Sequence, residues 1–169
     1  KKYKTKFTAA SFYSVDEFCH YFTTSKDKGG IYSQAIETRY KFTDARLGEL
    51  LSTLGDSVNI VLVSDHGYDF KLNHHTYAPN GTFIAMRPAF KKGVKVDGLN
   101  VYDIAPLCLT LMGFPLAEDM PRWDNPEWRQ TLLPEYLQRA TGKTLVTYET
   151  GRKEEFTPVQ SPIDEQIKE

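Results

Sequence analysis

The chain has 169 residues, enough for one domain with a sizeable core, and its 40% hydrophobic and 25% charged residues are typical of a globular protein. The formal net charge of −1 provides no strong field to attract a nucleic-acid polymer or an anionic membrane. No apolar run approaches the roughly 20 residues that span a bilayer, so we expect no membrane segment in this chain and no binding of nucleic-acid polymers.

The first half of the chain predicts a weak strand followed by two helices. Residues 6–14, "KFTAASFYS", are rich in β-branched and aromatic residues and favour a strand. Residues 16–22, "DEFCHYF", favour a short helical turn. Apolar side chains then recur at three- and four-residue intervals from 31 to 54, which predicts an amphipathic helix that ends at Gly55.

The second half predicts two strands and further helices. The apolar run "NIVLV", 59–63, is typical of a strand buried on both faces of a parallel sheet, and "TFIAM", 82–86, is a second strand candidate. A helix follows with Asp103 as its N-cap and Gly113 at its end, and another begins near Pro126. This alternation predicts an α/β fold with a mostly parallel sheet flanked by helices on both faces.

Residues suited to chemistry follow the strand 59–63 directly. Asp65 and His66 lie just beyond it, at the end of a strand where α/β sheets bind ligands, and Gly67 lets the chain turn away. A carboxylate beside an imidazole is a plausible pair of metal ligands. The alternative is an Asp–His pair that merely caps the next element.

Asp16 and His20 form a second pair of the same kind. They lie four residues apart, so on a helical turn they share one face and could hold a single metal ion. The alternative is an ordinary surface hydrogen bond.

The loop "NHHTYAPNG", 73–81, adds His74 and His75. Adjacent histidines point in different directions, so we expect only one of them to be a ligand. All three stretches follow strand ends, where an α/β sheet would bring them together. Two carboxylates and three imidazoles would supply most of two metal sites, which favours one shared site over three unrelated loops.

These motifs resemble the type I phosphodiesterase/nucleotide pyrophosphatase family of the alkaline phosphatase superfamily. The stretches that carry the resemblance are "FYSVDEFCHYF", "YKFTDARLGELLSTL", "VSDHGY", "HHTYAPNGTFIAMRPAFKKG" and "NVYDIAPLCLTLMGFPLAEDM", in the family's order over most of residues 7–120. The closing "SPIDEQIKE" is also similar to a helix found in relatives. The resemblance implies an alkaline phosphatase-like fold and a hydrolase with two divalent metal ions, usually zinc, that acts on a small phosphate ester such as a nucleotide-like diester.

The resemblance also implies roles for individual residues. Asp16, His20 and His75 would hold one metal, with His75 preferred over His74 because the family histidine lies four residues before a proline, here Pro79. Asp65 and His66 would hold the other metal, together with an earlier aspartate and a Ser or Thr nucleophile.

Only 15 residues precede Asp16, and none of them is an aspartate. We therefore expect residues 1–169 to be the C-terminal part of one catalytic domain, with the nucleophile upstream, no catalytic nucleophile in this chain, and little activity for the chain alone. An exposed sheet edge would then favour self-association.

Three further side chains are candidates for substrate binding. Tyr68 and Tyr77 could stack on a base, and Arg87 could hold a phosphate oxygen, although packing is the commoner role for such residues. Within the superfamily, a phosphomonoesterase, a sulfatase or a phosphotransferase remains an alternative activity. A non-catalytic module that binds metal for structure is the alternative from another class.

Overall fold

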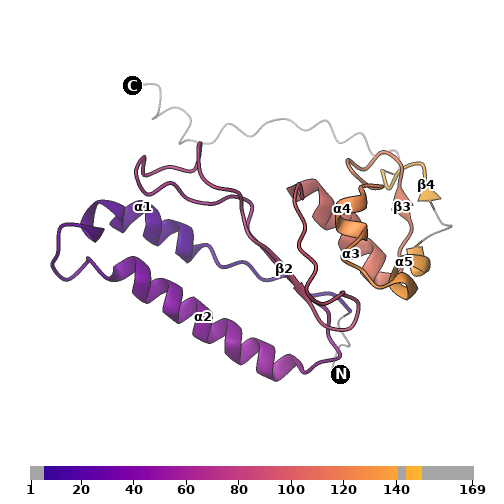
Figure 1. The fold of residues 1–169 in the computed structure, drawn as a ribbon, viewed down its shortest axis with the longest axis horizontal. Coiled ribbons are helices and arrows are strands. Elements are labelled where there is room, and N and C mark those ends of the chain that lie inside the picture. The colour runs from indigo at the N-terminus through magenta and orange to yellow at the C-terminus, as the bar shows by residue number, and fades with distance from the viewer. Residues whose placement is uncertain (1–5, 141–143, 150–169) are drawn as a thin grey trace.

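The computed structural model describes residues 6–140 and 144–149. Helices and short strands are both present, in agreement with the predicted α/β content. Figure 1 shows a pair of helices at one end of the molecule, a small sheet in the middle and a group of short helices at the other end. In chain order the elements are α1 (Ser14–Lys26), α2 (Ala35–Leu54), β1 (Ile60–Val63), β2 (Phe83–Met86), the 3-10 helix η1 (Val101–Asp103), α3 (Ile104–Met112), β3 (Leu116–Ala117), α4 (Pro126–Arg129), α5 (Pro134–Ala140) and β4 (Thr144–Leu145).

Helices α1 and α2 pack side by side. The helix predicted over 31–54 is confirmed as α2, which begins at Ala35 and ends before Gly55, whose φ of 65° is easily adopted only by glycine. Helix α1 is longer than the short turn predicted. Between the two helices, the Arg39 guanidinium lies over the rings of Phe18 and Phe42, at 5.6 and 5.0 Å from their centroids. These cation–π contacts add to the packing of the pair.

Strand β1 pairs with β2 in an antiparallel ladder that joins Ile60 to Met86 and Val63 to Phe83. The sequence predicts a parallel sheet flanked by helices on both faces, which the structure does not confirm. The segment 64–82 returns as a loop without a crossover helix, and such a connection joins antiparallel strands. The strand predicted over 6–14 is also not formed: residues 7–12 are exposed and unpaired, and α1 begins at Ser14.

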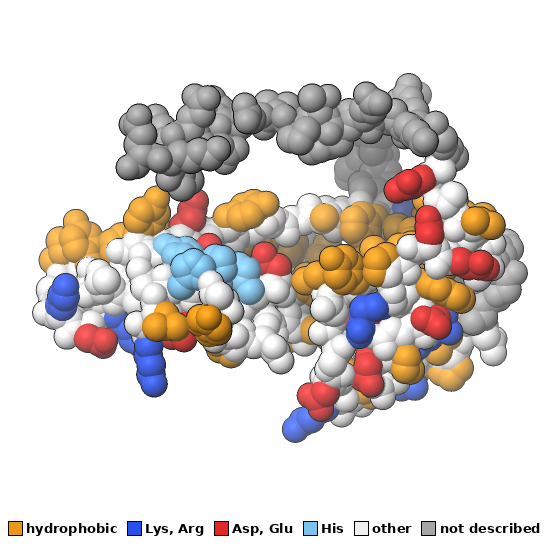
Figure 2. All heavy atoms as spheres, turned by 90° about the horizontal axis from the view of Figure 1, so that it is seen from above, with side chains coloured by type: hydrophobic (Ala, Val, Ile, Leu, Met, Phe, Trp, Pro, Cys, Tyr) orange, Lys and Arg blue, Asp and Glu red, His pale blue; other side chains and the backbone are white. Residues whose placement is uncertain are grey.

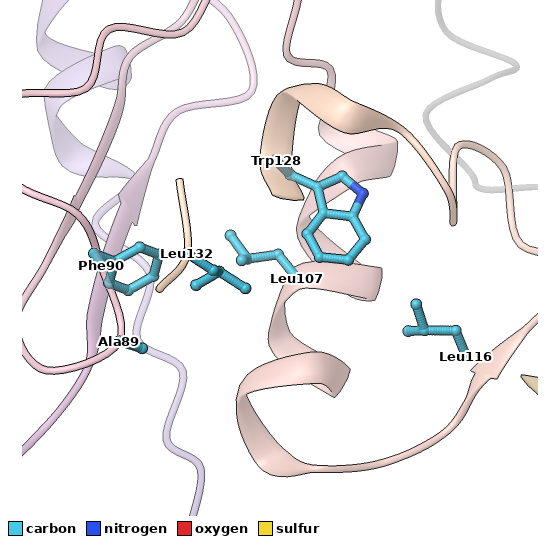
Figure 3. Close-up of a cluster of buried hydrophobic side chains, with 6 residues drawn as sticks. All are labelled: Ala89, Phe90, Leu107, Leu116, Trp128 and Leu132. Atoms are coloured by element: carbon cyan, nitrogen blue, oxygen red, sulfur yellow. The ribbon is translucent and has the colours of Figure 1, made fainter. Parts of the chain in front are cut away.

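The hydrophobic core lies at the end of the molecule that holds α3, α4 and α5. Figure 3 shows Leu107, from α3, between Trp128 and Leu132. The predicted helix with Gly113 at its end is confirmed as α3, since Gly113 has a φ of 75° and its N–H donates to the last carbonyls of the helix. The buried side chains of this cluster come from four segments: Ala89, Phe90, Leu107, Leu116, Trp128 and Leu132.

Asp103 has a different role from the predicted N-cap of α3, because its side chain makes no capping bond to that helix. The capping residue is Asn100, whose side chain accepts from the Tyr102 N–H while Asp103 accepts from the Asn100 N–H at 2.7 Å. This reciprocal pair is a capping box. The remaining carboxylate lone pairs accept from Arg122 and Asn125, and the Asp103 side chain is fully buried.

Within the described residues, no helix is long and apolar enough to cross a membrane.

Asn125 caps α4 through the Glu127 N–H, as the Asn–Pro pair at its start predicts. The closing stretch "SPIDEQIKE", 161–169, lies outside the described residues.

Candidate functional site

Two glycines close the loop that carries the histidines. The Gly67 N–H donates to the Pro79 carbonyl at 3.1 Å, and a Cβ on Gly67 would lie 2.2 Å from that oxygen. A Cβ on Gly81 would likewise lie 2.5 Å from the Ser64 carbonyl oxygen. Real side chains do not approach so closely, so only glycine lets the two ends of the loop meet. This closure brings His75 back to His66.

His66 has a fixed tautomer. Its Nδ1 atom lies 2.9 Å from the Gly67 carbonyl oxygen, which can only accept, so Nδ1 carries the proton. The opposite nitrogen, Nε2, lies 3.7 Å from Oδ2 of Asp65. The Asp65 side chain is 79% exposed. The Nε2 lone pair of His66 and the carboxylate of Asp65 therefore face the same space.

Asp16 and His20 repeat this arrangement on α1. Their separation by four residues places both side chains on one face of the helix, with Nε2 of His20 3.6 Å from Oδ1 of Asp16. Nδ1 of His20 faces the Tyr68 hydroxyl at 3.4 Å. Both side chains are partly exposed, so a ligand from solvent could reach them.

His74 and His75 differ in their hydrogen bonds. Nδ1 of His74 accepts from the Thr76 N–H at 3.0 Å and lies 2.7 Å from the Thr76 hydroxyl. The lone pair of this nitrogen is already used, so the proton of a neutral His74 is on Nε2 and no nitrogen remains free to bind a metal.

His75 lies at the centre of the four histidines. Its ring centroid is 4.3 Å from that of His66, 4.7 Å from that of His74 and 5.6 Å from that of His20. Figure 2 shows histidine side chains gathered in one pale blue patch with acidic side chains beside it. The site residues predicted from three separate stretches are thus brought together on one face.

The cluster is not a complete metal site. Among the residues that the structure describes, no three His, Cys, Asp or Glu side chains converge closely enough to hold an ion. The rings of His66 and His75 stack at 21°, so their nitrogens do not point at a common centre. In the pairs Asp16–His20 and Asp65–His66, Nε2 lies 3.6 and 3.7 Å from a carboxylate oxygen.

The three substrate candidates lie in different surroundings. Tyr68 is half-buried and donates to Asn73 Oδ1 at 2.6 Å, beside His20. Tyr77 is 79% exposed in the same loop. Arg87 lies away from the histidines, because its guanidinium donates to the carbonyls of Leu51 and Gly55 at the end of α2.

Asn73 was not identified from the sequence as a functional residue. It has a φ of 53°, a conformation that asparagine tolerates better than most residues. An asparagine between two turn-forming stretches was the only indication of this conformation in the sequence.

A groove of about 880 Å³ begins at Asp65 and runs along the sheet. Its walls are β1, β2, the loop 94–101 and the start of α3. Lys91 and Lys95 lie along it, together with apolar side chains of the strands. The groove therefore opens directly beside one of the carboxylates of the candidate site.

The family model for type I phosphodiesterase / nucleotide pyrophosphatase matches residues 1–101, more than half of the chain. The match includes every residue of the candidate site. No curated protein and no solved structure matches the chain.

Proposed function

Since this chain belongs to the type I phosphodiesterase/nucleotide pyrophosphatase family, we propose that its histidine cluster binds two divalent metal ions, most suitably zinc, for the hydrolysis of phosphodiester or pyrophosphate bonds. The observation that carries the proposal is the repeated pair: His20 and His66 each direct Nε2 toward a carboxylate oxygen, at 3.6 and 3.7 Å.

These separations fit a shared ligand. Two donors bound at 2.0–2.1 Å to one tetrahedral zinc ion lie about 3.4 Å apart. The donor set of imidazoles and carboxylates is also the one that zinc accepts in hydrolases. We assign Asp16, His20 and His75 to one ion and Asp65 and His66 to the other.

The chain's own residues would prepare these ligands. The Gly67 carbonyl holds the His66 proton on Nδ1 and leaves Nε2 free to bind. The carboxylates of Asp16 and Asp65 supply negative charge that offsets the charge of a bound cation. When bound, two metal ions stabilise the attacking and leaving oxygens of an in-line phosphoryl displacement.

The remaining ligand and the nucleophile would come from a segment that precedes the Asp16 motif in the family pattern. The same segment would complete the mostly parallel sheet flanked by helices that the resemblance implies, with residues 1–169 as part of that one domain. The short β1–β2 ladder and the open groove beside it support this proposal, because a two-stranded sheet is at best marginally stable alone.

The proposed substrate is a small phosphate ester, nucleotide-like or another diester. We assign Tyr77, exposed in the loop of His75, as a contact for its organic group. Arg87 is not part of this proposal, because its guanidinium is engaged by α2.

The test is the metal content of the full-length protein together with hydrolysis of bis-p-nitrophenyl phosphate and p-nitrophenyl phosphate. We expect about two zinc ions per chain and a preference for the diester. Asp65→Ala and His75→Ala should lose zinc and activity, whereas His74→Ala, the matched control, should keep its zinc. A preference for the monoester would reassign the activity within the superfamily. Metal binding without turnover would favour a structural metal site.

A further inference from the structure

We propose that Tyr68 and Asn73 are positioning residues that hold the proton of His20 on Nδ1 and so present Nε2 as its ligand atom. The inference rests on the proposed function for the role of the metal. The hydrogen-bond relay itself is a property of this chain.

The direction of the relay follows from the number of protons. The Tyr68 hydroxyl donates its only proton to Oδ1 of Asn73 at 2.6 Å. Toward Nδ1 of His20, 3.4 Å away, the same oxygen can then act only as an acceptor. A hydrogen bond across this contact therefore has Nδ1 of His20 as its donor, which leaves the lone pair on Nε2.

Packing holds the relay in place. The ring of Tyr68 meets the His20 ring edge-on, with centroids 5.0 Å apart, and contacts Phe70 on another side at 5.1 Å. Asn73 lies in a turn fixed by Asp69, whose carboxylate accepts from the backbone N–H of Lys71 at 2.8 Å. The loop therefore fixes the backbone that carries this acceptor.

The relay determines the state of Nε2, the nitrogen on the opposite side of the His20 imidazole. With Nδ1 protonated, Nε2 faces Oδ1 of Asp16 at 3.6 Å with a free lone pair. In the other neutral tautomer, Nε2 would carry a proton and could not bind a metal. His66 reaches the same state through the Gly67 carbonyl. A backbone carbonyl thus fixes the tautomer of His66, and the side chains of Tyr68 and Asn73 fix that of His20.

The hydrogen bond to Nδ1 of His20 should have a measurable effect on metal affinity. Loss of a hydrogen-bond partner of a ligating histidine costs about 10- to 100-fold in metal affinity. The 3.4 Å contact is at the long end of hydrogen-bonding distance. We therefore expect a loss near the lower end of this range.

The experiment compares Tyr68→Phe with wild type in the full-length protein. Phenylalanine keeps the ring contacts with His20 and Phe70 and removes only the hydroxyl. Tyr21→Phe, on the exposed side of α1, is the matched control. Two quantities are measured: the tautomer of His20 in the metal-free protein, from imidazole 15N shifts assigned with His20→Gln, and the zinc Kd, from competition with a chelator.

We expect wild type and Tyr21→Phe to carry the His20 proton on Nδ1. In Tyr68→Phe the proton should shift toward Nε2, and the zinc Kd should rise about 10-fold. Asn73→Asp keeps an acceptor and tolerates the positive φ, so it should behave as wild type, whereas Asn73→Gly tolerates the same φ without an acceptor and should behave as Tyr68→Phe.

An unchanged tautomer in Tyr68→Phe would overturn the inference, and so would a changed tautomer with an unchanged zinc Kd. Failure of the wild-type protein to bind zinc would instead overturn the proposed function. The tautomer comparison in the metal-free protein would then still decide whether the relay exists.

Discussion

Arg122 holds the buried carboxylate of Asp103 with a single nitrogen, because its Nε lies 2.9 Å from Oδ1 and 3.0 Å from Oδ2. The guanidinium also donates to the Gly98 carbonyl at 2.7 Å. Asp103 thereby joins the start of α3 to the segment before α4. This contact connects the loop that lines the groove to the hydrophobic core.

We expect Asp103→Asn to lower the free energy of unfolding by about 2 kcal/mol, because hydrogen bonds to a charged acceptor are among the stronger ones. The measurement is urea unfolding at pH 7. Asp97→Asn, at an exposed aspartate in the preceding loop, should change the stability by less than about 0.5 kcal/mol. Equal effects of the two substitutions would refute the structural role of Asp103.

The stabilisation by Asp103 should also depend on pH. Burial acts to raise the pKa of Asp103, but hydrogen bonds from Arg122, Asn125 and the Asn100 N–H outweigh it and hold the pKa below its usual value. A lowered pKa in the folded state means that the stabilisation is complete above the unfolded pKa, about 3.9. It is lost as the pH falls through the lower folded value. Urea unfolding of wild type and Asp103→Asn at pH 7, 5, 4 and 3 should therefore show a constant difference down to about pH 5 and a shrinking one below it.

A substitution at Arg87 tests whether this side chain binds substrate or caps the C-terminal end of α2. Its side chain is 15% exposed and donates to the carbonyls of Leu51 and Gly55, where a cation also interacts favourably with the helix dipole. Arg87→Gln should lower the free energy of unfolding by about 1–2 kcal/mol and leave KM unchanged. Arg46→Gln, on α2, removes an exposed pair with Glu49 and a cation–π contact with Phe42, and it is the control. A raised KM with unchanged stability would assign Arg87 to the substrate instead.

A substitution at Gly67 tests whether activity requires the loop that carries the histidines to close. Since a Cβ there would lie 2.2 Å from the Pro79 carbonyl oxygen, Gly67→Ala must displace the loop and move His75 from His66. We expect a loss of about 100-fold in kcat/KM, the size that a misplacement near 1 Å can cause. Gly48→Ala, in the middle of α2 with no atom within 4 Å of the added carbon, should instead stabilise the protein by about 0.5–1 kcal/mol. Full activity in Gly67→Ala would show that the loop geometry is not needed.

The sequence predicts the helices and the gathering of the four histidines better than it predicts the sheet. Local rules suffice for α2 and α3, because apolar spacing and a terminal glycine determine both. They suffice for the Asp16–His20 pair as well, since a separation of four residues on a helix fixes the shared face. Whether a strand pairs in parallel or antiparallel depends on which strand becomes its neighbour, and the apolar run of β1 contains no information on that partner.

Side-chain roles that depend on distant partners are also absent from the local pattern. Asp103 precedes a helix and has the composition of an N-cap, but Arg122, nineteen positions later, determines where its carboxylate points. Arg87 follows a strand near the predicted site, yet the end of α2 engages it. In both cases a charged side chain satisfies backbone or buried groups of another element, and only the three-dimensional fold shows which.

The apolar face of α2 gives a prediction on association. Tyr40, Leu50 and Leu54 recur at helical spacing, and they are 50%, 41% and 37% exposed. In the part of the chain that the structure describes, β1 and β2 also pair only with each other and leave an open edge on each side. Unpaired edges and exposed apolar stripes both favour contacts with a second copy.

We therefore expect the mass measured by light scattering to rise with protein concentration. Replacing Leu50 and Leu54 together by glutamate should reduce this rise, because charge on the stripe opposes burial between two copies. Ser52→Glu adds a charge on a different side of the same exposed turn and should leave the association unchanged. A monomer at every concentration would refute self-association. Association that persists in the double variant would locate the contact at the strand edges instead of the helix.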